Sequence, residues 1–536
     1  MIYRTLLLLI ALLTLSLAQK SVQKQSNFGN VNYLTKEQLR DYLSFIASDE
    51  LEGRDTPSRG LNIAAKFLAT HLSRWGYTPA GDSGSFFQRI ALQRRRIDAQ
   101  QTTVEINGQQ FSYGADFIAT PVSTTLTAPL VYVKNGYIIR KKNINPYDGI
   151  DVKGKMMVVL GGLPPGIRFS DLSGKRGVDY DTPTNYAKNN GAVGVITIPT
   201  LLGLSRWERD RINYVEHGEI SPAYFLDKEK QDIVSITASQ PMVEALFAGE
   251  SVRTTQLYNR TQADSLTSFD FASSKKVTVH IATLVDTQYT QNVVAVLEGS
   301  DKKLKNEYIA FGAHYDHIGI GTPVDGDSIY NGADDDGSGT TALLAMAEAF
   351  AKGPRPKRSL LFVWHVAEEK GLWGSKYFVE QPTVPLSSIV TQLNMDMIGR
   401  SKPDTGEGSL NDNVSTNNEV FVIGSVMMST TLGKLVEDVN ASLLKLKLNY
   451  KFDNAEDHLR LFYRSDHYNY AKQGIPIVFF FDGLHEDYHR PSDEVSKIDF
   501  DKLLKVTKTV FATGWKLANL PVKPAIDKTF PAERFE

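Results

Sequence analysis

The chain has 536 residues, too many for one ordinary domain, and its 42% hydrophobic and 22% charged residues are typical of a globular protein rather than a fibrous or disordered one. A formal net charge of −2 without a basic tract argues against nucleic acid as a partner. The absence of cysteine excludes disulfide bonds, thiolate metal ligands and a cysteine nucleophile.

The first predicted element is a secretory signal peptide in residues 1–18. Arg4 is followed by a nearly unbroken apolar run from Thr5 to Leu17, and small residues precede a cleavage point after Ala18. This run is shorter than the roughly 20 residues of a membrane-spanning helix, and no other stretch is long and apolar enough. We therefore expect no stable membrane span after signal removal. A periplasmic or secreted bacterial protein best fits an exported chain without cysteine.

After the signal peptide, the chain divides into a main domain and an insert. Residues 30–118 form the first part of the main domain, and the capping-box pattern of Thr35 with Gln38 predicts a helix start. Residues 119–265 change to short β runs interrupted by glycine and proline, which predicts a compact, strand-rich inserted domain. The main domain then resumes at residues 266–520, and the tail at residues 521–536 is peripheral.

The second part of the main domain alternates apolar strands with amphipathic helices. Strands are predicted at residues 293–297, 308–311, 359–366, 389–395, 420–423 and 475–481. Helices are predicted at residues 340–352, 372–380, 431–444 and 466–473. This alternation predicts an α/β fold with a mixed, mostly parallel central sheet flanked by helices.

Three adjacent carboxylates stand in the segment Asn331-Gly-Ala-Asp-Asp-Asp-Gly-Ser-Gly339, directly before a predicted helix. Their mutual repulsion raises their pKa values and disfavours a folded loop unless a cation compensates the charge. The segment is therefore a candidate metal site. The alternative is a solvated acidic turn, and the segment alone does not decide between the two.

Histidines and carboxylates also follow several of the predicted strands, where ligands bind in open α/β sheets. They are His314, Asp316, Glu368, Glu369, Asp396 and His489. Two histidines and several carboxylates without cysteine form a ligand set for Zn²⁺ or a related ion, and one shared carboxylate can hold two metals roughly 3.5–4 Å apart. Of the neighbours Glu368 and Glu369, one can bind metal while the other takes a proton from water. The alternative for this pair is two solvated acids at a helix start.

A second metal motif, His485-Glu-Asp-Tyr-His489, fits the zinc-binding pattern His-Glu-x-x-His. That motif requires both histidines on one face of a long helix. Gly483 and Pro491 bracket the segment and leave too little room for such a helix. We therefore do not expect this mode of binding.

Six segments together resemble the successive motifs of the dizinc aminopeptidase family, whose relatives include glutamate carboxypeptidases, glutaminyl cyclases and the transferrin receptor. They are Gly312 to His317, Asn331 to Gly339, Ala367 to Glu369, Asn394 to Met397, Arg464 to His467 and Tyr488 to Asp493. Leu51-Glu-Gly-Arg54 is similar to exported bacterial members, and the insert resembles a protease-associated domain.

The resemblance implies a role for each motif residue. His314, Asp335 and Asp396 are expected to bind one zinc, and Asp335, Glu369 and His489 the other, so that Asp335 bridges the two ions. Glu368 is the expected general base, and Asp316 is expected to orient His314. Asp334 and Asp336 are expected to support Asp335, and the Asp335–Asp336 peptide is expected to be cis. His317 is not expected to be a ligand.

Three further residues are candidate substrate contacts, namely Tyr463, Arg464 and His467. For His467 the alternative is a histidine at a helix start that bonds to the backbone.

The resemblance implies an exported enzyme with two zinc ions that acts on peptides with a free N-terminus. A metal-bridging hydroxide would attack the first peptide carbonyl while Glu368 moves the proton. Alternatives are a carboxypeptidase or a glutaminyl cyclase on the same scaffold, or a non-catalytic binding protein. The preferred N-terminal residue and the oligomeric state cannot be read from the motifs.

Overall fold

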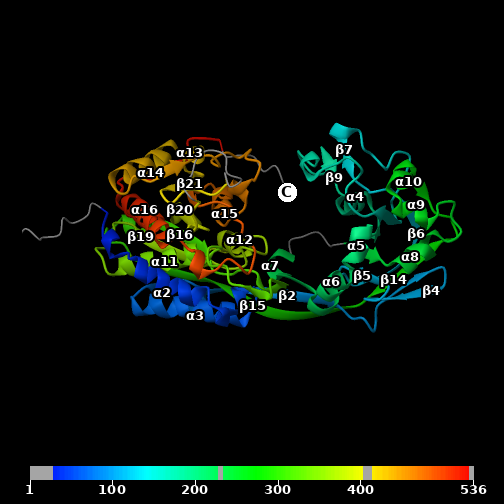
Figure 1. The fold of residues 1–536 in the computed structure, drawn as a ribbon, viewed down its shortest axis with the longest axis horizontal. Helices are drawn as coiled ribbons and strands as arrows, with labels where there is room; N and C mark the ends of the chain where they lie inside the picture. Colours follow the sequence, from blue (N-terminus) through cyan, green and yellow to red (C-terminus); the bar gives the residue numbers. More distant parts are fainter. Residues whose placement is uncertain (1–27, 227–232, 403–412, 530–536) are drawn as a thin grey trace, which may run out of the picture. The chain divides into compact units, whose positions relative to one another are not determined.

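The computed structural model describes residues 28–226, 233–402 and 413–529, and the predicted signal peptide lies outside them. Within these residues the chain forms two compact units, one of residues 28–90 with 289–529 and the other of residues 91–288 (Figure 1). The predicted insert, residues 119–265, lies within the second unit. Strands β2 (Phe87–Ile97) and β15 (Thr283–Leu297) continue across the boundary between the units.

The first unit is built on one mixed sheet with four parallel strands at its centre. Their order is β19 (Ser359–His365), β16 (Tyr308–His314), β20 (Ile389–Met395) and β23 (Ile477–Phe481). Antiparallel neighbours follow on both sides, β15 beside β19 and β21 (Glu419–Ile423) beside β23, and β22 (Lys447–Asn449) continues parallel to β21. The predicted mixed, mostly parallel sheet is confirmed.

Helices cover both faces of this sheet because both faces are apolar. The helices near it are α2 (Lys36–Ile46), α3 (Arg59–Arg74), α11 (Gly337–Ala351), α12 (Trp373–Glu380), α13 (Ser425–Met428), α14 (Thr430–Ser442), α15 (His467–Lys472) and α16 (Phe500–Asn519). On one face Phe362 stacks on Phe311 and meets Phe350 of α11 edge to face, and Phe350 stacks on Phe511 of α16. The alternate strand residues belong to the opposite core, which includes Phe378 of α12 and residues of α15.

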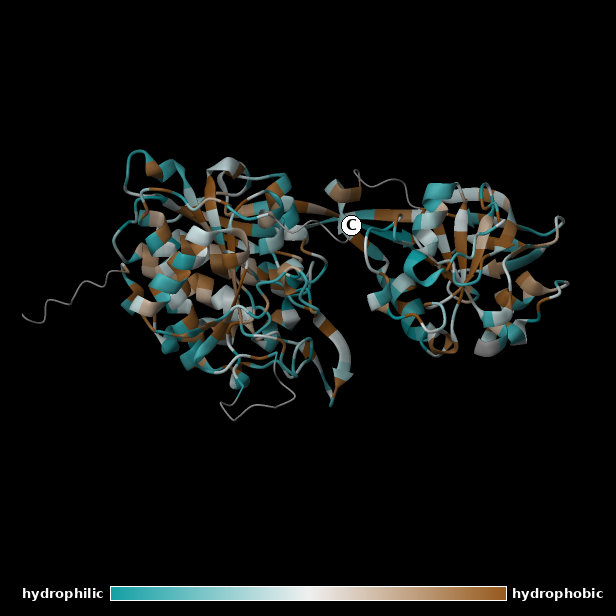
Figure 2. Cartoon of the chain, turned by 90° about the horizontal axis from the view of Figure 1, so that it is seen from above, coloured by the Kyte–Doolittle hydropathy of each residue, from teal (hydrophilic) through white to brown (hydrophobic). Residues whose placement is uncertain are grey.

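The central strands are rich in buried apolar residues, and Figure 2 shows them largely in brown among helices that carry both teal and brown residues. Such two-sided burial is typical of parallel strands. Among the described residues, no helix is both long and apolar enough to cross a membrane.

Helix α2 begins where the capping box predicts. The Thr35 side chain accepts a hydrogen bond from the backbone nitrogen of Gln38 at 3.1 Å, and Leu39 and Leu43 are buried. On α3, by contrast, the core face is aliphatic. The recurrence of Ile63, Phe67, His71, Leu72 and Trp75 at helical spacing predicts that His71 faces the core. In the structure His71 is only half-buried beside aromatic rings such as Tyr42.

The second unit contains another sheet, whose strand order is β4-β3-β14-β6-β8-β10-β12-β5. The bounds are β3 Thr103–Ile106, β4 Gln109–Ser112, β5 Phe117–Ala119, β6 Thr124–Tyr132, β8 Met156–Leu160, β10 Gly194–Ile198, β12 Val234–Ala238 and β14 Lys276–Ile281. Strands β6, β8, β10 and β12 are parallel. Helix α4 (Pro183–Asn190) precedes β10, and its C-cap residue Gly191 has a left-handed backbone conformation.

Candidate metal centre

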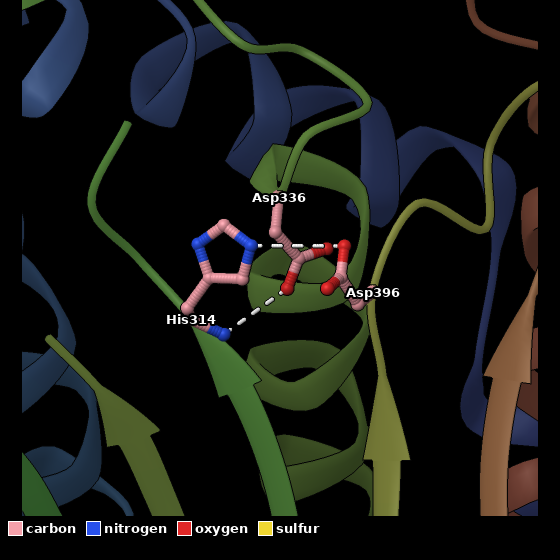
Figure 3. A group of neighbouring side chains, drawn as sticks. All are labelled: His314, Asp336 and Asp396. Atoms are coloured by element: carbon pink, nitrogen blue, oxygen red, sulfur yellow. Dashed lines mark hydrogen bonds and ion pairs between the residues drawn. The ribbon is translucent and has the colours of Figure 1, made fainter. Parts of the chain in front are cut away.

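The loop of residues 331–336 connects β18 (Asp327–Tyr330) to α11, and Asp336 fixes its end. One carboxylate oxygen of Asp336 accepts hydrogen bonds from the backbone nitrogens of Gly339 at 2.9 Å and Met397 at 3.1 Å. The other accepts from the backbone nitrogen of His314 at 3.1 Å (Figure 3). Asp336 therefore joins the start of α11 to the ends of β16 and β20.

The preceding aspartates are held in a similar way. Asp334 accepts a hydrogen bond of 2.7 Å from the backbone nitrogen of Gly399. The carboxylate of Asp493 accepts from the backbone nitrogens of Asp334 at 2.9 Å and Asp335 at 3.1 Å. The peptide bond between Asp335 and Asp336 is cis, as the resemblance implies.

The side chain of Asp335 lies between two histidines. Its Oδ1 is 3.2 Å from Nε2 of His314, and its Oδ2 is 3.2 Å from Nε2 of His489. Asp396 Oδ1 lies 3.6 Å from the same nitrogen of His314, and Glu369 Oε2 lies 3.1 Å from the same nitrogen of His489. The five predicted ligands thus form two groups that share Asp335.

The donor set of the two groups fits zinc. Nε2 of His314 and Nε2 of His489 are buried and have no hydrogen-bond partner among the described residues. Two ligand atoms at 2.0–2.1 Å from a tetrahedral ion are about 3.3 Å apart, a separation close to those found within each group. Imidazole nitrogens and carboxylate oxygens are also ligands that zinc accepts.

Asp336 lies close enough to His314 and Asp396 to be considered as a metal ligand (Figure 3). However, its two oxygens already accept three backbone hydrogen bonds. Its geometry is therefore that of a support for the loop, whereas the oxygens of Asp335 face the histidines.

Glu368 and Glu369 are neighbours in the chain but face different histidines. Glu368 Oε2 lies 3.9 Å from Nε2 of His314, while Glu369 faces His489. Asp316 contacts both sides of this arrangement. Its carboxylate accepts from the backbone nitrogen of Glu368 at 3.1 Å, and its backbone oxygen lies 3.1 Å from Nδ1 of His314. Asp316 therefore contacts His314 through its backbone carbonyl oxygen, because the carboxylate of Asp316 lies 3.8 Å from Nδ1 of His314.

The electrostatic environment separates the carboxyl groups into two kinds. Burial raises the pKa of Glu368 well above its ordinary value, and the nearby carboxylates of Asp396 and Glu369 raise it further against the opposing effect of His314. Burial also raises the pKa of Asp335, but the imidazole groups of His314 and His489 beside its two oxygens outweigh this effect and hold the pKa well below its usual range. Glu368 is thus suited to carrying a proton and Asp335 to remaining ionised.

A small cavity opens beside these groups and is lined by both polar and apolar side chains. It is lined by Asp335, Glu368, Asp396, Met397, Leu461, Arg464, Ser465, Phe479, Phe481, Leu484 and Tyr488. Arg464 is exposed and donates a hydrogen bond of 3.3 Å to the hydroxyl of Tyr488.

The other two candidate substrate contacts, Tyr463 and His467, are not among the lining residues of this cavity. His467 is fully buried, its Nε2 donates to the backbone oxygen of Phe462 at 2.8 Å, and its ring stacks on Phe479. This geometry favours the alternative interpretation, a histidine at a helix start that bonds to the backbone.

His485 and His489 do not share a helix face. The segment between them is a turn, and Nε2 of His485 lies 3.2 Å from Asp334 rather than beside His489. The prediction that residues 485–489 do not form a helix with both histidines on one face is confirmed.

Sequence reasoning missed the role of Arg54, which is completely buried beneath the loop. Its guanidinium donates to the backbone oxygens of Tyr315 at 2.9 Å, Asn331 at 2.8 Å and Gly332 at 3.1 Å, and also to that of Ile46. The one available signal was its place in the motif Leu51 to Arg54.

Comparisons with known proteins agree with this geometry. The model of Peptidase family M28 matches residues 292–514. A probable zinc metalloprotease of Pyrenophora tritici-repentis is 27% identical over 261 residues, covering 43% of this chain and 58% of the relative. Leucine aminopeptidase 1 of Ajellomyces capsulatus is 29% identical over 240 residues, covering 42% of this chain and 56% of the relative. The chain thus spans about half the length of the curated relatives it matches.

Among solved structures, an aminopeptidase from Aneurinibacillus sp. strain AM-1 is similar with a TM-score of 0.50 and 19% identity. The match covers 94% of this chain and 98% of that chain, so the likeness in fold extends over both units. The match to the model of Peptidase family M28, over residues 292–514, coincides with the strands and loops that carry the two histidine groups.

Proposed function

We propose that the chain is an exported zinc-dependent aminopeptidase that hydrolyses the N-terminal peptide bond of peptides. The observation that carries the proposal is Asp335, whose two oxygens face two separate histidines beside Glu368. The match of residues 292–514 to the model of Peptidase family M28 and the aminopeptidases among the relatives support the same reaction class. Export rests on the apolar segment of residues 1–18.

Two zinc ions would be held in the two groups described above, the first by His314, Asp335 and Asp396 and the second by Asp335, Glu369 and His489. When bound, such ions lower the pKa of a water molecule and polarise a carbonyl group, which is the chemistry that amide hydrolysis requires. Asp493 holds the backbone nitrogen of the shared aspartate, and the neighbouring Asp336 is fixed by the backbone nitrogen of His314.

Glu368 is the proposed general base. Its Oε2 would accept a proton from the attacking water and return it to the leaving amine nitrogen, so that the peptide C–N bond breaks as the amine becomes neutral. Its raised pKa supports this role because a carboxylate with a higher pKa is a stronger base toward the attacking water. The hydrogen bond from the backbone nitrogen of Glu368 to the carboxylate of Asp316 fixes the backbone position of Glu368.

The lined cavity would hold the N-terminal residue of the substrate. Its apolar lining residues, which include Leu461, Phe479 and Phe481, suit an apolar side chain. The carboxylates of Glu368 and Asp396, which also line the cavity, would attract an unblocked α-ammonium group. This arrangement favours a free N-terminus over an acetylated one.

Arg464 is the specific observation that favours a second candidate, a carboxypeptidase. It is the arginine that lines the cavity, and a guanidinium group binds carboxylates well. A single exposed arginine is less than the cluster expected for a dedicated carboxypeptidase, so aminopeptidase action remains our proposal. A glutaminyl cyclase or a non-catalytic binding protein is disfavoured because all five ligand positions and the base position carry competent side chains.

The test uses purified protein without residues 1–18 and four versions of one peptide: unmodified, N-acetylated, C-amidated and doubly blocked. Release of the N-terminal amino acid from the unmodified and C-amidated forms is expected, with loss of activity on chelation and recovery with zinc. Equal cleavage of the N-acetylated form would refute the aminopeptidase assignment. The same protein expressed with residues 1–18 in a bacterial host should appear outside the cytoplasm in shortened form, and full-length protein confined to the cytoplasm would refute export.

A further inference from the structure

His317 is a third histidine near the candidate metal groups, and the proposed function gives it no role. Its side chain is fully buried, and its backbone nitrogen donates to the backbone oxygen of Arg54 at 3.2 Å. Its Nδ1 lies 2.7 Å from Oε1 of Glu369 and 3.9 Å from Oδ2 of Asp335. The ring therefore points at the proposed second zinc group.

The orientation of this ring is fixed by close packing. A Cβ atom added at Gly332 would lie 2.5 Å from both Cγ and Cδ2 of the His317 ring, and Gly332 has a φ of +57°. Only glycine avoids that overlap, because even alanine would collide with the ring. On another side, the rings of His317 and His489 meet edge to face with their centres 5.9 Å apart. These contacts restrict the ring to the orientation that reaches Glu369.

The chemistry of the pair identifies the direction of the hydrogen bond. An ionised carboxylate offers acceptors only, so the proton between Oε1 of Glu369 and Nδ1 of His317 belongs to the histidine. Neutral imidazole with a proton on Nδ1 has no lone pair there for a metal. The separation of 2.7 Å is also a hydrogen-bond length, shorter than the 3.1–3.6 Å between candidate ligand atoms elsewhere in the site.

The two oxygens of Glu369 therefore have different partners. Oε1 meets the N–H group of His317, whereas Oε2 lies 3.1 Å from Nε2 of His489. We propose that His317 is a positioning residue that fixes Oε1 of Glu369, so that Glu369 offers Oε2 alone to the zinc ion held with Asp335 and His489. This inference rests on the two-zinc centre of the proposed function. It adds a chain-specific support for one of the two ions.

Such a hydrogen bond matters because it holds a ligand in its binding orientation. Supports of this kind typically change metal affinity by about 10- to 100-fold when they are removed. The contact is made to Glu369, which belongs to the second group alone. The effect of removing it should therefore fall on the second zinc and spare the ion held by His314 and Asp396.

The experiment measures zinc affinity in the purified protein and does not depend on peptide cleavage. Metal-free wild type, His317→Ala and His317→Asn are titrated with zinc in competition with a chromogenic chelator, and cobalt is substituted to record coordination by its visible spectrum. His71→Ala is the matched control, because His71 is a half-buried histidine that contacts aromatic rings.

In His317→Ala one of the two zinc ions is expected to bind about 10- to 100-fold less tightly than in wild type, while the other keeps its affinity. The cobalt spectrum should change as Glu369 becomes free to rotate. His317→Asn retains an N–H donor near the position of Nδ1 and should recover most of the lost affinity, and His71→Ala should match wild type. The His317→Asn variant also keeps the test decisive if the alanine variant does not fold.

Wild-type affinity for both ions in His317→Ala, with an unchanged cobalt spectrum, would overturn the proposal. An equal loss at both ions would also overturn it, because that result indicates a general structural role. If wild type binds two zinc ions with the expected dependence on His317 but cleaves no unblocked peptide, the proposed aminopeptidase function is refuted while the role of His317 stands.

Discussion

Arg54 Nη1 donates a hydrogen bond of 2.8 Å to the backbone oxygen of Asn331, which lies 277 residues later in the chain. A second guanidinium nitrogen reaches the backbone oxygen of Gly332 at 3.1 Å. The loop with three aspartates is thus held from beneath by a cation that contacts its backbone and leaves its carboxylates available. Burial lowers the pKa of Arg54 to about 10, against the opposing effect of aspartates such as Asp316 and Asp335, so Arg54 stays charged at neutral pH.

Replacing Arg54 with methionine should strongly destabilise the first unit. The change leaves several buried carbonyl oxygens without a donor and removes the positive charge next to the aspartate cluster, at an expected cost of about 3–5 kcal/mol in the free energy of unfolding. Urea titration followed by tryptophan fluorescence measures this loss. Arg74→Met is the control, since Arg74 is exposed at the end of α3 and should cost less than about 0.5 kcal/mol. Equal midpoints for the two variants would contradict the role of Arg54.

The strands and helices of the first unit could be predicted because their periodicity is strong. The run Ser359 to His365, for example, is buried at every position, as a central parallel strand requires. The candidate metal residues could be predicted from the same pattern, because residues such as His314 and Asp396 stand where neighbouring strands end.

The supports of the site could not be predicted in the same way. Arg54 and Asp493 act through backbone atoms of a loop that lies far from both in sequence, and only the folded chain brings them together. His71 shows that periodicity alone can also predict the wrong burial for a residue. Helical periodicity placed it on an apolar face, but tertiary packing buries the aliphatic residues of α3 and leaves the aromatic ones partly exposed.

The different contacts of Asp335 and Asp336 lead to opposite expectations for their asparagine variants. Asp335→Asn should lose most of the bound zinc, because the shared ligand loses its negative charge at both groups. Asp336→Asn should retain about two zinc ions per chain. Its remaining carbonyl oxygen can still accept from Gly339 and Met397, while the lost bond to the backbone nitrogen of His314 costs about 1 kcal/mol of stability.

Zinc content by mass spectrometry after gel filtration, together with urea titration, checks both expectations. If Asp336→Asn loses one zinc while Asp335→Asn keeps two, the ligand is Asp336 and the geometric argument for Asp335 is wrong.

The buried His467 should make the protein sensitive to acid. Burial lowers its pKa to about 3, against 6.5 for an exposed histidine, so the folded state keeps it neutral while the unfolded state takes up a proton. Between about pH 3 and 6.5 the unfolded state binds more protons than the folded state, so the free energy of unfolding decreases as the pH falls through this window. Above pH 6.5 the stabilising contribution of neutral His467 is fully present. From pH 7 to 4.5 this one group should remove about 2–3 kcal/mol.

His467→Phe isolates this contribution, since it keeps a ring against Phe479 without a titrating group. Urea titrations at several pH values should give a shallower pH dependence for the variant than for wild type between pH 4.5 and 7. Parallel curves would show that His467 does not carry the effect.

Removal of metal should lower the melting temperature of the first unit and leave the second unaffected. The carboxylates of Asp335, Glu369 and Asp396 converge within one buried site, and a cation that binds only the folded state compensates their repulsion. At a free zinc concentration of 1,000 times Kd, such binding stabilises the fold by about 4 kcal/mol.

Hydrogen exchange should therefore increase on chelation in residues 289–402 but not in residues 91–226, because both candidate metal groups lie in the first unit. Added zinc should reverse the change in wild type and in Glu368→Gln, which keeps every proposed ligand, but not in Asp335→Asn. A melting temperature that ignores both chelator and zinc would contradict the proposed metal centre.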